Sequence, residues 1–185
     1  MNRRMVVFLL GRILLLEAAL MIPSVLVGLI YREAITWCFL PAMGALVLLG
    51  LFGVKKPKDT AIYAREGFLT VAAAWLLMSL FGAVPLWLSG GFSSFWDCLF
   101  EIVSGFTTTG ASILSSVEQL PHCILFWRSF SHWVGGMGVL VFVLAVMPMS
   151  QERSMHLMRA EVPGPVVGKL VPRMRDTAKI LYGVY

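Results

Sequence analysis

Four consecutive residues, Thr107-Thr108-Thr109-Gly110, carry the most specific chemistry in this sequence. They follow an apolar stretch that is too short to cross a membrane. In an extended conformation this segment can turn successive backbone carbonyls toward one axis, where the oxygens replace the hydration shell of a monovalent cation. Gly110 suits this role because it lacks the Cβ that forbids unusual backbone dihedrals. A plain turn that only reverses the chain is the alternative explanation of the same residues.

Two charged residues, Glu101 and Arg128, flank this segment within apolar sequence. Counted from helix starts expected near Ser94 and Pro121, each lies seven positions in, about 10 Å below the membrane surface at about 1.5 Å per residue. An unpaired Arg at this depth is costly, so we expect an ion pair that holds the short helix against the following span. Alternatively, Arg128 extends to the surface and Glu101 bonds elsewhere.

Four apolar stretches are long enough to carry these residues through a bilayer, whose core needs about 20 helical residues. They cover residues 5–30, 34–54, 68–88 and 123–147. Before the threonines, Ser94 and Asp97 form a capping-box pattern, which predicts a re-entrant helix over residues 94–104 and a filter over residues 106–112. The expected fold is an all-α membrane protein, with two N-terminal transmembrane helices followed by one unit of span, pore helix, filter and span.

The composition supports a membrane protein. Apolar residues make up 58% of the 185 residues and charged residues 14%, whereas soluble domains have roughly 45–50% and about 25%. Because the basic residues sit between apolar spans, the net charge of +5 reflects membrane topology rather than a nucleic-acid partner. Cys38, Cys98 and Cys123 form no CxxC pair, so neither a zinc site nor a disulfide framework is expected. No enzyme-like set of residues is found, and an enzyme is not expected.

The basic residues also predict the orientation of the chain, since cytoplasmic loops collect Lys and Arg. Twelve of the 15 fall on one side of the predicted spans: Arg3, Arg4, Lys55, Lys56, Lys58, Arg65, Arg153, Arg159, Lys169, Arg173, Arg175 and Lys179. The N-terminus and the C-terminal tail are therefore expected in the cytoplasm. The outer interface should carry an aromatic belt, formed by Tyr31, Trp37, Trp87, Phe92, Trp96 and Trp127.

Other residues in the spans have two interpretations each. Gly135, Gly136 and Gly138 allow close helix packing or a bend, and packing is favoured. Glu17 and His132 could mark an ion path, but an interhelix hydrogen bond for Glu17 and a hydrogen-bonded interior position for His132 are favoured.

Acidic residues at the predicted outer mouth have similar alternatives. Asp97 and Glu118 could concentrate cations there. For Asp97, the helix-start role is at least as well supported.

Four segments in order resemble a known family. They are residues 100–112 (Phe-Glu-Ile-Val-Ser-Gly-Phe-Thr-Thr-Thr-Gly-Ala-Ser), 126–138 (Phe-Trp-Arg-Ser-Phe-Ser-His-Trp-Val-Gly-Gly-Met-Gly), 159–165 (Arg-Ala-Glu-Val-Pro-Gly-Pro) and 172–179 (Pro-Arg-Met-Arg-Asp-Thr-Ala-Lys). The sequence resembles the membrane subunit of the bacterial Trk potassium uptake system, in the Trk/Ktr/HKT superfamily. The resemblance covers nearly the whole chain.

The resemblance implies a K⁺-translocating pore in the bacterial inner membrane, built from four span–pore–span units per subunit. It also implies a homodimer on a cytosolic, nucleotide-binding regulatory ring, with K⁺ as the transported ion and no covalently bound cofactor. The K⁺ sites map onto the carbonyls of Thr107, Thr108, Thr109 and Gly110, with Thr108 and Thr109 as the first choices. Channel-like conduction and ion-coupled symport both remain open.

The chain differs from the family in having one pore unit. Residues 1–60 are expected to form an N-terminal hairpin, residues 61–150 the first pore unit, and residues 151–185 a cytoplasmic linker with the start of the next helix. The chain is therefore expected to be a fragment that supplies one of four filter loops. Alternatives are a self-assembling homotetrameric K⁺ channel and a non-conducting membrane scaffold.

Overall fold

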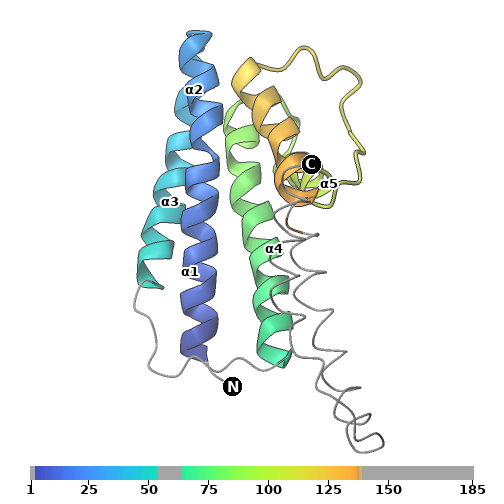
Figure 1. Cartoon of the computed structure of the whole chain (residues 1–185). Helices are drawn as coiled ribbons and strands as arrows, with labels where there is room; N and C mark the ends of the chain where they lie inside the picture. Colours follow the sequence, from blue (N-terminus) through green and yellow to red (C-terminus); the bar gives the residue numbers. More distant parts are fainter. Residues whose placement is uncertain (1–2, 54–63, 137, 139–185) are drawn as a thin grey trace, which may run out of the picture. The chain divides into compact units, whose positions relative to one another are not determined.

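The computed structural model describes residues 3–53, 64–136 and 138, and these residues form helices and connecting loops without any strand (Figure 1). Three segments of this part of the chain are long and apolar enough to cross a membrane: Arg3–Ile30, Ala34–Phe52 and Glu66–Leu88. The predicted all-α membrane fold is confirmed. Of the fourth predicted span, residues 123–136 and 138 are helical, whereas residues 137 and 139–147 and the tail 151–185 lie outside the described residues.

The first span is two helices in line, α1 (Arg3–Leu20) and α2 (Ile22–Ile30), rather than the single helix that its hydropathy predicts. Pro23 stands in the first turn of α2. A proline has no N–H to continue the helical ladder, and its ring clashes with the carbonyl four residues earlier. Backbone hydrogen bonds from Met21 to Glu17 (3.1 Å) and from Val25 to Met21 (3.2 Å) keep the two helices in line.

The second span begins with the short 3-10 helix η1 (Ala34–Cys38) and continues as α3 (Phe39–Phe52). Figure 1 shows α1 beside α3 and α4. The backbones of α1 and α3 approach closely, since a Cβ on Gly11 would lie 2.8 Å from the carbonyl oxygen of Gly50. Small residues permit such contacts in membranes, where packing replaces the hydrophobic effect as the force between helices.

The third span, α4 (Ala64–Leu88), packs against α1, α3 and the shorter α5 (Phe95–Phe106). At 12 residues α5 cannot cross a bilayer. The predicted capping box is confirmed: the Ser94 hydroxyl accepts from the Asp97 N–H (3.2 Å), and the Asp97 carboxylate accepts from the Ser94 N–H (3.1 Å). The helix ends at Phe106, two residues later than expected.

Trp127 is fully buried, so its predicted place in an outer aromatic belt is wrong. Its indole N–H donates to the Gly82 carbonyl of α4 (2.9 Å), and its ring meets Phe106 edge to face at 6.3 Å. An aromatic residue near a span end can face lipid or protein, and only the packing decides which. Four other aromatic residues of the predicted belt are more than half exposed: Tyr31, Trp37, Trp87 and Trp96.

Candidate functional site

The end of α5 is a Schellman motif, a common way to close a helix. The Thr109 N–H donates to the Ser104 carbonyl and the Thr108 N–H to the Gly105 carbonyl, both at 2.9 Å. Thr108 therefore has a left-handed backbone, with φ of 56°, at a position where glycine is usual. The predicted extended conformation is wrong at this residue, because the helix cap fixes its dihedrals.

Residues 107–110, which we call the filter segment, are all exposed, and Gly110 also has a positive φ of 74°. In a regular strand successive residues alternate between two faces. The positive φ angles of Thr108 and Gly110 break that alternation. None of the hydrogen bonds among the described residues uses the carbonyl oxygens of these four residues. These four backbone oxygens therefore have no assigned donor within the described part of the chain.

Two hydroxyl groups fix the borders of the filter segment. The Ser104 hydroxyl donates to the Ala111 carbonyl (2.6 Å), so the row of free carbonyls ends at Gly110. The Thr107 hydroxyl donates to the Val103 carbonyl (2.7 Å) and lies 2.8 Å from the Thr109 hydroxyl. The hydroxyl proton of Thr107 points to the Val103 carbonyl, so in the contact between the two hydroxyl groups Thr109 donates and Thr107 accepts.

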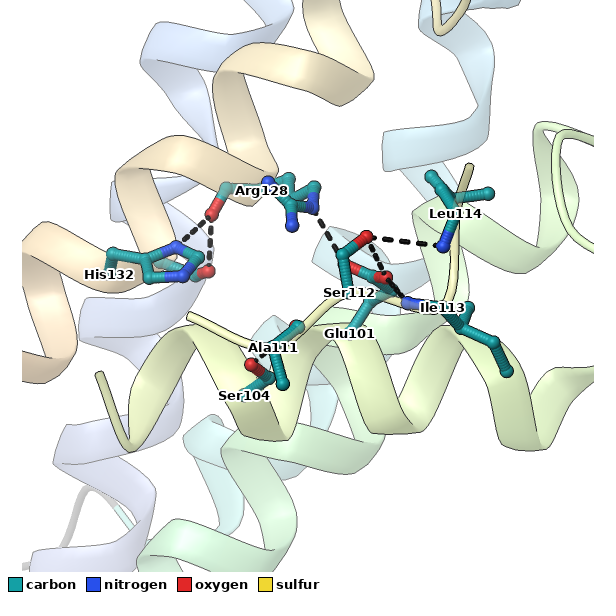
Figure 2. Close-up of polar contacts among 9 residues, drawn as sticks. Glu101, Ser104, Ala111, Ser112, Ile113, Leu114, Arg128 and His132 are labelled. Carbon is teal, nitrogen blue, oxygen red and sulfur yellow. Dashed lines mark hydrogen bonds and ion pairs between the residues drawn. The ribbon is translucent and has the colours of Figure 1, made fainter. Parts of the chain in front are cut away.

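Glu101 connects three segments, as Figure 2 shows. Its Oε1 accepts from the Ser112 hydroxyl and the Ile113 N–H, both at 2.7 Å, and its Oε2 accepts from Arg128 Nε at 2.6 Å. Glu101 is fully buried and the Arg128 side chain is 13% exposed. The expected ion pair is present, and Arg128 does not extend to the surface.

The contacts of Glu101 with Ser112 and Ile113 were not anticipated from the sequence. These residues lie 11 and 12 positions after Glu101, in the loop beyond the end of α5, where no periodic pattern applies. One carboxylate thus ties α5, the chain that leaves the filter segment and helix 122–136 together.

Direct packing adds to this connection. A side chain at Gly105 would collide with the Ser131 hydroxyl, so α5 and helix 122–136 touch there. His132 is half-buried, and its Nδ1 donates to the Arg128 carbonyl (3.0 Å), as expected of an interior histidine (Figure 2).

The three glycines beyond this point are described only in part. Gly135 is buried, Gly136 is half-buried and Gly138 is exposed. Their close-packing role stays a prediction.

Glu33 is a structural residue that the sequence did not reveal. Its carboxylate accepts from the His122 N–H (2.7 Å), the Cys123 N–H (3.0 Å) and His122 Nδ1 (2.8 Å), which caps the start of helix 122–136. Partial burial tends to raise the pKa of Glu33, but the hydrogen bonds from Cys123 and His122 outweigh it and lower the pKa to about 2. The partner lies 89 residues away, so no local pattern could have indicated it.

Three further acidic residues can now be placed. Asp97 has the expected helix-start role, and Glu118 is exposed. The interhelix hydrogen bond expected for Glu17 is wrong, since neither carboxyl oxygen has a partner among the described residues. The hydropathy pattern placed Glu17 at the right depth, but it could not say what faces it.

Comparison with known proteins assigns the chain to a family. Residues 39–185 match the sequence profile of the family described as TrkH, cation transport protein. The chain belongs to the TrkH family. The resemblance inferred from the sequence is thereby confirmed, and membership in a family of cation transporters agrees with the apolar spans of the fold.

Individual TrkH-family relatives match over the whole chain. The Trk system potassium uptake proteins TrkH of Halomonas elongata and of Escherichia coli K12 are each 36% identical over 189 residues. These matches cover 100% of this chain and 39% of each relative, so the chain spans about two fifths of their length. The crystal structure of the potassium transporter TrkH from Vibrio parahaemolyticus has a TM-score of 0.79 at 31% identity, covering 100% of this chain and 37% of that one.

Proposed function

We propose that this chain serves potassium uptake across the bacterial inner membrane by supplying one of four selectivity-filter loops of a K⁺-translocating subunit. The backbone carbonyls of residues 107–110 would bind K⁺, with Thr108 and Thr109 as the principal sites. The observation that carries this proposal is a segment of four exposed residues, held between a capped helix and a buried carboxylate, whose carbonyl oxygens have no assigned donor among the described residues. The names of the relatives, potassium uptake proteins, support the choice of ion.

The geometry suggests how such a loop would act. Carbonyl oxygens can replace the hydration shell of K⁺ only if they stay in place when the ion leaves. The Schellman motif fixes the entry to the filter segment, and Glu101 fixes its exit through Ser112 and Ile113. The C-terminal end of α5 adds a partial negative charge beside the segment, which favours a cation.

One loop cannot surround an ion, because a K⁺ filter is a ring of about four such loops. We therefore propose the remaining pore units of the same subunit as the first partners, with residues 61–150 as the unit present here. A homodimer and a cytosolic, nucleotide-binding regulatory ring are further proposed partners, as the Trk family resemblance implies. The N-terminus and the C-terminal tail would lie in the cytoplasm.

Rubidium flux into proteoliposomes tests this function. The chain is reconstituted alone and together with downstream pore units, each as wild type and as Gly110→Asp. Gly90→Asp is the matched control, because Gly90 and Gly110 have similar positive φ angles (70° and 74°) and a Cβ added to either would meet no other atom within 4 Å. Gly90 lies before α5 and outside the filter segment.

We expect flux only with the downstream units, retained in Gly90→Asp and lost in Gly110→Asp. Flux from the chain alone that Gly110→Asp abolishes would instead establish a homotetrameric channel. A complete assembly that transports equally well with Gly110→Asp would show that residues 107–110 do not form the filter, and would favour a scaffold role for this chain.

A further inference from the structure

Glu17 is a fully buried carboxyl group in the middle of the first membrane segment. It lies 14 residues after Arg3 and 13 before Ile30, the ends of that segment. Its exposed fraction is zero, so solvent does not reach its oxygens. Both oxygens nevertheless lack a hydrogen-bond partner among the described residues.

This carboxyl group lies beside Gly82 of α4, and apolar side chains of α5 approach the same glycine. A Cβ added to Gly82 of α4 would lie 3.6 Å from Glu17 Oε1, 3.1 Å from Ile102 and 3.3 Å from the Phe106 ring. The Gly82 carbonyl already accepts from the Trp127 indole. Glu17 therefore occupies a packed site between α1 and α4, next to the helix that precedes the filter segment.

The described residues provide no cation to neutralise a charge at this site. Arg12, on the same helix, is exposed, and its guanidinium lies 5.4 Å from the centre of the Phe8 ring. Glu66 is an acidic residue of α4. It lies 16 residues before Gly82, about 24 Å along the helix, which is too far to affect Glu17 directly.

On the other packed elements, α2 and α3 carry no charged side chain. The titratable groups of η1, α5 and helix 122–136 are Cys38, Asp97, Cys98, Glu101, His122, Cys123, Arg128 and His132. The Arg128 side chain, which is 13% exposed, is already paired with Glu101.

A hydrogen-bonded partner within the same segment is also absent. The Ser24 hydroxyl is the other buried polar group without a partner among the described residues. It lies seven residues after Glu17, about 10 Å along the helix axis, which is beyond hydrogen-bond reach.

We propose that Glu17 is a proton-binding site inside the membrane, whose carboxyl group is neutral and carries a proton at pH 7 while α1 is packed against α4. An ionised carboxylate in an apolar site without donors is far more costly than a neutral carboxyl group. A metal cation in the same place would need several oxygen ligands, whereas the metal-ligand side chains of the described residues form no group of three or more.

The location gives this proton a structural consequence. Its release would place an unneutralised charge beside Gly82, a residue that Ile102 and Phe106 also approach, and Phe106 directly precedes Thr107 of the filter segment. The proton therefore stabilises the packing of α1 against α4.

Infrared spectroscopy of the chain in lipid bilayers at pH 7 tests the proposal. The chain is labelled with ¹³C at glutamate side-chain carboxyl groups, which separates glutamate bands from aspartate bands. Spectra of the wild type are compared with those of Glu17→Gln. Glu33→Gln is the matched control, because it makes the same chemical change at a carboxylate that accepts three hydrogen bonds and is ionised at this pH.

We expect a labelled carboxylic acid band in the wild type that Glu17→Gln removes and Glu33→Gln retains. Loss of carboxylate absorption in Glu17→Gln, with no acid band in the wild type, would overturn the proposal and indicate a bound cation or water. If Glu17→Gln does not fold, the wild-type spectrum still decides against the proposal when it shows no labelled acid band. None of these outcomes depends on ion flux.

Discussion

Thr108 combines a β-branched side chain with a left-handed backbone, a pairing that L-residues avoid. The Schellman hydrogen bonds at the end of α5 impose this conformation. A glycine would satisfy the same cap without a Cβ clash, so the threonine places local strain at the filter segment.

We predict that Thr108→Gly raises the free energy of unfolding by up to about 1 kcal/mol. Relief of the left-handed strain is worth about 1–2 kcal/mol, and the greater flexibility of glycine in the unfolded chain offsets about 0.5–1 kcal/mol. Thermal unfolding in detergent measures the change. Thr109→Gly, at a residue without positive φ, should lower stability by about 1 kcal/mol. Equal destabilisation by both variants would contradict the strain argument.

Glu33 gives the contact between the start of the second span and helix 122–136 a defined dependence on pH. Its pKa is about 2 in the folded chain and 4.5 ordinarily, so ionised Glu33 favours the folded state. This contribution is complete above about pH 4.5 and is lost as the pH falls toward 2. We predict that Glu33→Gln lowers stability at pH 7 and flattens the acid side of the stability curve. Denaturation followed by circular dichroism from pH 7 to pH 3 measures the unfolding free energy of both proteins. An equal dependence of this free energy on pH in the wild type and in Glu33→Gln would contradict the capping role.

At the scale of elements, the ion pair between Glu101 and Arg128 joins α5 to helix 122–136. Removing one partner of a buried pair leaves the other charge without compensation, which typically costs about 3–5 kcal/mol. The pair also has local support, since Ser112 and Ile113 donate to the same carboxylate.

We predict that Glu101→Gln and Arg128→Gln each destabilise the chain by about 3 kcal/mol or more, and that the double variant costs much less than the sum. A double-mutant cycle of unfolding free energies measures this coupling. Glu118→Gln is the exposed control and should stay within about 0.5 kcal/mol of the wild type. Additive effects would show that the two charges act independently.

At the scale of the whole molecule, the distribution of basic residues predicts which loops face the cytoplasm. Ser115 lies in the exposed loop after the filter segment. We predict that Ser115→Cys reacts with a membrane-impermeant maleimide in spheroplasts, whose outer membrane has been removed. Lys56→Cys should react only after permeabilisation. The wild type is the unlabelled control, because Cys38, Cys98 and Cys123 are buried. The reverse labelling pattern would invert the proposed topology.

The sequence by itself determined the features that depend on composition and on short spacings. Bilayer thickness fixes the length of an apolar span, so hydropathy alone located the three spans found in the described part of the chain. The capping box at Ser94 and Asp97 is a contact over three residues, and helical rise placed Glu101 and Arg128 at equal depth. Each of these follows from local geometry or from the solvent.

Only the tertiary structure decided which faces of these helices meet. The sequence could not show that Glu101 holds the exit of the filter segment, that Glu33 caps a helix 89 residues later, or that Trp127 points inward. The sequence also predicted an interhelix hydrogen bond for Glu17, and the packing of the described residues provides none. In a membrane both the lipid and the protein interior are apolar, so hydropathy cannot distinguish a lipid-facing side of a helix from a buried one.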